Sequence, residues 1–193
     1  MHFLKNENLI GNNNLKINSM NYEEKLQNVS VLGAAGKMGS GILLLTAIEM
    51  ADLQLKPENR SKNFALNAID VSPAALTGLY GYLKTQVRKL AEKKMVALRE
   101  VYKDNKNLIE NGEIIDQYID DVLKIVHTST SIESAYNSGL IFEAIVEDSA
   151  LKVKLIKQIL ANNSNDPWFF TNTSSVSINE LDTDAGINCK ILG

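Results

Sequence analysis

Three glycines at regular spacing are the first residues of this sequence whose type and arrangement indicate chemistry. Gly33, Gly36 and Gly39 follow the apolar run Val29–Leu32 and precede an apolar, helix-compatible run. A glycine turn between a strand and a helix lets the backbone approach a pyrophosphate, to which the helix N-terminus offers free N–H groups. The spacing G-x-x-G-x-x-G is one residue longer than the common dinucleotide fingerprint, so a turn that binds nothing is the alternative interpretation.

Asp70 is the next candidate, because it closes a predicted second strand, Phe64–Ile69. An acid at this place in a dinucleotide fold binds the adenosine ribose hydroxyls, and it would repel the 2′-phosphate of NADP. Asp70 follows Gly39 by about 30 residues instead of the usual ~20. We therefore expect residues 52–63 to form an inserted loop. The alternative is that Asp70 only caps the turn that follows.

An acid and a serine follow two further predicted strands. Leu140–Val146 ends at Glu147, and Trp168–Thr171 is followed closely by Ser174. Because ligands bind at the carboxyl edge of a parallel sheet, both side chains are candidates for one site. A serine hydroxyl there can donate to a substrate oxygen that gains carbonyl character. The alternatives are a turn serine and an acid that only stabilises a helix start.

The elements that would position these residues alternate along the chain. Ser72 and Pro73 are typical of a helix start, and apolar residues then recur at helical spacing to about residue 123, with an interruption at Asn111. Further strands are expected at 125–127, 140–146, 168–171 and from residue 190, with helices between them. The order predicts an α/β fold: a doubly wound, Rossmann-type, mostly parallel sheet with a long helical excursion after the second strand.

Composition limits the class of protein. The chain has 193 residues, 45% of them hydrophobic, and a formal net charge of -3. We expect an Asn-rich mobile leader at 1–25 and one domain at 26–193. The lack of a basic tract or a long apolar run argues against nucleic-acid and membrane partners, and no metal site is predicted. The single Cys189 fits a reducing compartment, so the cytoplasm is expected.

Two segments add a family resemblance. FEAIVEDSALKVKL and FFTNTSSVSINEL, with the residues between them, resemble the NAD-binding domain of the 3-hydroxyacyl-CoA dehydrogenases, and the similarity runs from Val29 to Gly193. The short run GAAGKMG also fits the start of a dihydrodipicolinate reductase, but that family explains neither segment.

The resemblance implies roles for individual residues, with NAD as the cofactor and acyl-CoA as the substrate. Ser174 would contact both the nicotinamide end and the reacting oxygen of the substrate. Lys93 would contact coenzyme A, whereas the sequence alone favours a solvated face for Lys89, Lys93 and Lys94. The residues that the resemblance assigns to the cofactor are Gly33, Gly36, Gly39, Asp70, Glu147, Lys152 and Ser174.

The family's general base is the part of the pattern that this chain lacks. The family places that histidine in an H-[FY]-x-N-P segment, oriented by a glutamate, and the chain ends just before it. Neither His2 nor His127 occupies that position. The resemblance implies a parent protein, a homodimer with a C-terminal helical domain, that oxidises (S)-3-hydroxyacyl-CoA to 3-oxoacyl-CoA in fatty-acid β-oxidation or a related pathway. This chain alone is expected to bind NAD without turnover. The alternative is a non-catalytic, stand-alone dinucleotide-binding module.

Overall fold

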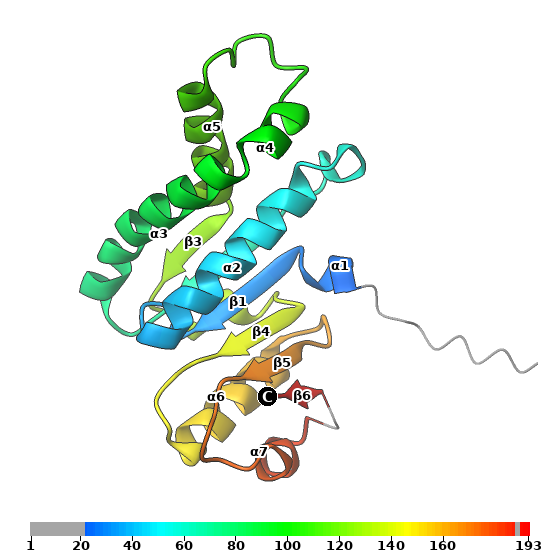
Figure 1. Cartoon of the computed structure of the whole chain (residues 1–193). Helices are drawn as coiled ribbons and strands as arrows, with labels where there is room; N and C mark the ends of the chain where they lie inside the picture. The colour runs from blue at the N-terminus through cyan, green and yellow to red at the C-terminus, as the bar shows by residue number, and fades with distance from the viewer. Residues whose placement is uncertain (1–21, 188–189) are drawn as a thin grey trace, which may run out of the picture.

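The computed structural model describes residues 22–187 and 190–193, and it contains one parallel sheet (Figure 1). The six strands lie in the order β3-β2-β1-β4-β5-β6, and all neighbouring strands are parallel. This is the strand order of a doubly wound dinucleotide-binding fold, whose topological switch point lies between β1 and β4. The predicted fold class is confirmed. The strands are β1 Asn28–Leu32, β2 Ala65–Ile69, β3 Val126–Ser129, β4 Leu140–Glu143, β5 Trp168–Thr171 and β6 Ile191–Leu192.

Helices cover both faces of the sheet. Successive side chains along each strand point to opposite faces, so the buried core consists of two clusters, one on each face. Val29 and Val31 of β1 belong to one buried cluster, whereas Leu32 belongs to the other. The first cluster contains residues of α2 (Lys37–Gln54), α3 (Pro73–Lys93) and α5 (Asn111–Lys124). The second contains residues of α6 (Ser149–Asn162) and α7 (Ile178–Ala185). A parallel sheet requires such cover on both faces because each strand buries side chains on each face.

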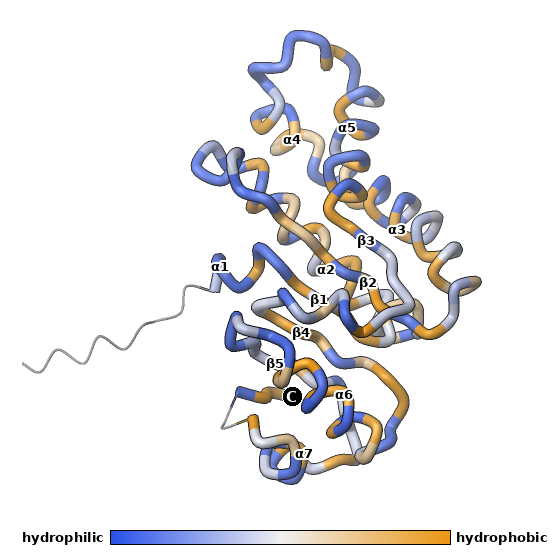
Figure 2. Tube along the Cα trace, turned by 180° about the vertical axis from the view of Figure 1, so that it is seen from behind, coloured by the Kyte–Doolittle hydropathy of each residue, from blue (hydrophilic) through white to orange (hydrophobic). Residues whose placement is uncertain are grey.

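The predicted helical excursion is a hairpin of α3 and α5 joined through α4 (Met95–Val101), and it extends beyond the sheet (Figure 1). The Ser72 side chain accepts the N–H of Ala75 at 3.3 Å, so this residue caps α3 as predicted. Asn111 does not interrupt a helix but begins α5, because the side chains of Glu110 and Glu113 form a capping box. Figure 2 shows β1 and β4 as mainly hydrophobic and the connection between α4 and α5 as hydrophilic.

Two predicted boundaries around the site differ clearly from the structure. Residues 52–63 are not an inserted loop, because α2 continues to Gln54 and a 3-10 turn follows at Pro57–Asn59. The buried Asn59 amide donates to the Leu53 carbonyl at 2.9 Å and closes this connection. The strand predicted at 140–146 ends at Glu143, where the chain leaves the sheet.

The leader expected at 1–25 also ends earlier. Tyr22–Lys25 forms helix α1, and the buried Lys25 ammonium donates to the carbonyls of Asn165 and Asp166 at 2.8 and 2.6 Å. These bonds fix the helix to the connection before β5. The rest of the predicted leader, which includes His2, lies outside the described residues, and so does Cys189. Among the described residues no helix is long and apolar enough to cross a membrane.

Candidate functional site

The glycine turn is built so that two of its positions have no room for a side chain. Gly33 has φ +75°, and a Cβ there would lie 2.5 Å from the Ala144 carbonyl oxygen. A Cβ at Gly39 would lie 2.0 Å from the Gly33 carbonyl oxygen. Real Cβ atoms do not approach this closely, so Gly39 is required for α2 to pack against the turn after β1, and Gly33 is required for that turn to pack against the chain that leaves β4.

Gly36 has a different position, because it is the N-cap of α2. A Cβ there would meet the Gly33 carbonyl oxygen at 3.2 Å, a tight but less severe contact. No side chain caps this helix start, so the first-turn N–H groups after Gly36 have no side-chain acceptor. Lys37 and Met38, which begin the helix, are both exposed. Such an uncapped start is suited to a phosphate, which supplies both the acceptor atoms and the negative charge.

Asp70 lies directly after β2 and is bonded to the glycine turn. One carboxylate oxygen accepts the Ala35 N–H at 3.0 Å, and the other accepts the Ser72 N–H at 3.1 Å. Ala35 is one of the two residues between Gly33 and Gly36, so the lengthened turn is tied to the acid. An ionised carboxylate has about four acceptor sites, which leaves capacity for ribose hydroxyls.

A cavity of about 350 Å³ lies between the carboxyl ends of β1, β2 and β4. Gly33, Gly36 and Asp70 line it together with apolar side chains, among them Ile145 and Leu155. An apolar concavity with a few polar groups is typical of a small-molecule site. A larger cavity of about 530 Å³ between the end of α2, α4 and α5 contains none of the predicted site residues.

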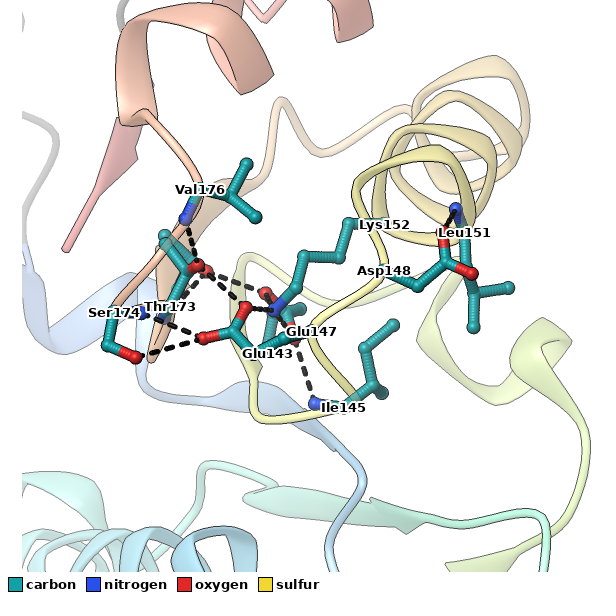
Figure 3. Close-up of polar contacts among 10 residues, drawn as sticks. Glu143, Ile145, Glu147, Asp148, Leu151, Lys152, Thr173, Ser174 and Val176 are labelled. Carbon is teal, nitrogen blue, oxygen red and sulfur yellow. Dashed lines mark hydrogen bonds and ion pairs between the residues drawn. The ribbon is translucent and has the colours of Figure 1, made fainter.

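The Glu147 carboxylate contacts the loop that carries Ser174 (Figure 3). One oxygen accepts the Ser174 N–H at 2.8 Å and its hydroxyl at 3.3 Å, and the other accepts the Thr173 hydroxyl at 2.8 Å. These bonds, led by the Ser174 N–H, lower the pKa of Glu147 to about 2. Glu147 is therefore ionised at neutral pH. The Ser174 hydroxyl is exposed and its bond is long, so it can turn to a substrate oxygen at little cost.

Lys152 lies beneath this contact, in the interior. Its ammonium donates to both carboxylate oxygens of Glu143 at 2.8 Å, and the two side chains are 1% and 2% exposed. Its distance to the nearest Glu147 oxygen is 3.4 Å. The family resemblance assigns Lys152 to the cofactor, and the structure places this side chain in the interior. Glu143 was not singled out, although it is the first acid of the EAIVE segment and closes β4.

Lys93, the predicted coenzyme A contact, and His127, which was not predicted to be catalytic, both lie away from this group. Lys93 is the last residue of α3 and is exposed. A helix of this length spans about 30 Å, so Lys93 is that far along α3 from Ser72 at the carboxyl edge. His127 lies in the edge strand β3 and is also exposed. The described residues contain no group of three or more His, Cys, Asp and Glu side chains that could hold a metal ion.

A parallel sheet in this order, an uncapped glycine turn and an acid after the second strand define a dinucleotide-binding domain. The model of the 3-hydroxyacyl-CoA dehydrogenase NAD binding domain matches residues 28–193. The chain therefore belongs to the 3-hydroxyacyl-CoA dehydrogenase family, as its NAD-binding domain. The resemblance and the cofactor inferred from the two segments are both confirmed.

Curated relatives carry the same family name. The chain is 31% identical over 111 residues to the mitochondrial hydroxyacyl-coenzyme A dehydrogenase of Sus scrofa, covering 56% of this chain and 35% of the relative. It is 26% identical over 167 residues to a probable 3-hydroxyacyl-CoA dehydrogenase of Caenorhabditis elegans, covering 86% of this chain and 44% of the relative. The chain thus spans less than half the length of these relatives.

Solved structures share the fold. M. tuberculosis FadB2 matches with a TM-score of 0.60 and 21% identity, covering 87% of this chain and 48% of that one. The (S)-3-hydroxybutyryl-CoA dehydrogenase PaaH1 from Ralstonia eutropha matches with a TM-score of 0.57 and 22% identity, covering 86% of this chain and 47% of that one.

Proposed function

We propose that this chain supplies the cofactor half of an NAD-dependent oxidoreductase that converts (S)-3-hydroxyacyl-CoA to 3-oxoacyl-CoA in fatty-acid metabolism. One observation carries the proposal: Asp70 and Ser174 follow strands on opposite sides of the switch point, at the same edge of the sheet. β2 and β5 are three strand spacings apart, about 14 Å. That separation suits an extended dinucleotide with its adenosine ribose near Asp70 and its nicotinamide near Ser174.

The residues present fit such a ligand in order along this edge. The apolar cavity beside Asp70 would take the adenosine, and the uncapped start of α2 after Gly36 would take the pyrophosphate. NAD supplies a hydride acceptor when it is bound. Ser174, whose N–H is held by the ionised Glu147, would donate a hydrogen bond from its hydroxyl to the substrate oxygen and orient the carbon that loses the hydride.

Among residues 22–187 and 190–193, no histidine lies next to Ser174, where the family places its general base. His127 lies in β3, four strand spacings or about 19 Å from β5, so it cannot take a proton from a substrate held at Ser174. The loss of a general base alone typically lowers the rate by ~10²–10⁴-fold. We therefore propose that this chain binds NAD without turnover. From the family resemblance, we also propose that the active parent protein is a homodimer.

Two finer assignments belong to the same proposal. Lys93 would contact the coenzyme A part of the substrate, since only a ligand that extends far along α3 could reach it. The cytoplasm is the proposed compartment. The pig relative is named as mitochondrial, so an import signal in the parent protein would overturn this choice.

Calorimetric titration of the chain with NADH and with NADPH tests the proposed function. We expect saturable binding of NADH, binding of NADPH at least about tenfold weaker, and loss of NADH binding in Asp70→Ala. The variant Gly41→Ala is a matched control, because Gly41 is in the first turns of α2 and a Cβ there meets nothing within 4 Å. A folded chain that does not bind NADH would contradict the proposal and favour a lengthened turn that is not competent for the cofactor.

A further inference from the structure

A buried ion pair lies directly beneath the proposed nicotinamide end of the site. Glu143 closes β4 and Lys152 is in the first turns of α6, and their side chains are 2% and 1% exposed. Removing two charges from water is costly, and an apolar pair of similar volume is often as stable or more so. Stability alone therefore does not explain this pair, and its further contacts indicate what it does.

The first set of contacts runs through Thr171. The Thr171 hydroxyl donates to Glu143 at 2.6 Å and accepts the Thr173 N–H at 3.3 Å. The Asn172 N–H donates to the Glu143 carbonyl at 2.8 Å. Glu143 therefore fixes the chain where it leaves β5, on the near side of Ser174.

The second set runs through Glu147. The Lys152 ammonium is 3.4 Å from one oxygen of Glu147, whose other oxygen accepts the Ser174 N–H (Figure 3). The Glu147 side chain is 38% exposed and follows a segment without regular structure, so it has room to turn toward solvent. The Lys152 ammonium, which Glu143 holds in place, attracts the Glu147 carboxylate and keeps it in contact with the loop.

We infer that Glu143 and Lys152 are positioning residues for Ser174, and that Lys152 acts on Ser174 through Glu147. The pair holds the loop of residues 172–175 from both sides, at the Thr173 N–H through Thr171 and at the Ser174 N–H through Glu147. What Ser174 does to a substrate rests on the proposed function above. The positioning itself does not, because it is a property of the chain without ligand.

The test is amide hydrogen exchange, measured by NMR on the full chain without cofactor. The variant is the double replacement Glu143→Leu with Lys152→Met, which leaves no unpaired charge in the interior. Exchange at Ser174 is expected to become at least tenfold faster, while exchange at Val31 in the central strand stays within about twofold. Lys154→Met, an exposed lysine of the same helix, is the control and should change neither.

Two outcomes would overturn the inference. Unchanged exchange at Ser174 in the double variant would show that the pair does not hold the loop, and equal acceleration at Val31 would show that it serves only the fold. If the double variant does not fold, the isosteric Thr171→Val decides, since it removes one set of contacts and should accelerate exchange at Thr173 about threefold. Failure of the chain to bind NADH would refute the proposed function and leave this exchange result standing.

Discussion

The two halves of the site, on either side of the switch point, are built by different means. In the β1–α2–β2 half, Gly33 and Gly39 leave no space for a Cβ, and backbone N–H groups do the bonding. In the β4–α6–β5 half, Glu143, Lys152 and Glu147 form a side-chain network of charges. The packing of the first half should therefore be sensitive mainly to side-chain volume, whereas the second half should be sensitive mainly to charge.

The largest effect expected is in the charged half. Lys152→Met leaves the Glu143 carboxylate buried without its cation, which should lower the free energy of unfolding by about 3–5 kcal/mol. Chemical denaturation measures this change. Adding Glu143→Leu should recover most of the loss, because both charges are then removed together. A double variant as unstable as the single one would show that volume, not charge, governs this half too.

A smaller loss is expected in the glycine half. Gly39→Ala drives a methyl group against the Gly33 carbonyl, 2.0 Å from the position of its Cβ, and should cost about 1–3 kcal/mol. Gly41→Ala, two residues further along α2, should instead stabilise by about 0.5–1 kcal/mol. Both values come from the same denaturation experiment. Equal behaviour of the two variants would mean that the turn relaxes and that its glycines are not required by packing.

The smallest effect expected is the pH dependence that separates the halves. The pKa of Glu147 is lowered to about 2, from an ordinary value near 4.5. Its contribution to stability is therefore complete above about pH 4.5 and is lost as the pH falls toward 2, where the unfolded chain binds a proton more readily. Urea denaturation between pH 7 and pH 3 should show a shallower decline for Glu147→Gln than for the wild type. Parallel curves for the two proteins would remove this distinction between the halves.

Much of the site could be predicted because its signals are local. The cap at Ser72 follows from residue types a few positions apart, and the structure confirms that its side chain accepts a helix N–H. The extent of α2 was underestimated, because the last turn of the helix depends on the burial of Leu53 in the core, which the local sequence does not show. The strand at 140–146 was overestimated for a similar reason, as its apolar residues line the cavity after the strand ends.

The sequence by itself determined the strand–glycine–helix unit, the acid after the second strand, and the family, because each depends on residues that are close together in the chain. Only the tertiary structure decided that the buried Lys152 donates to Glu143 and that the Thr171 hydroxyl donates to the same carboxylate. It also decided that the Asp70 carboxylate accepts the N–H of Ala35. The physical reason is that the burial of a charge depends on which strand ends converge around it. In this molecule β4, β5 and α6 converge only once the sheet is assembled.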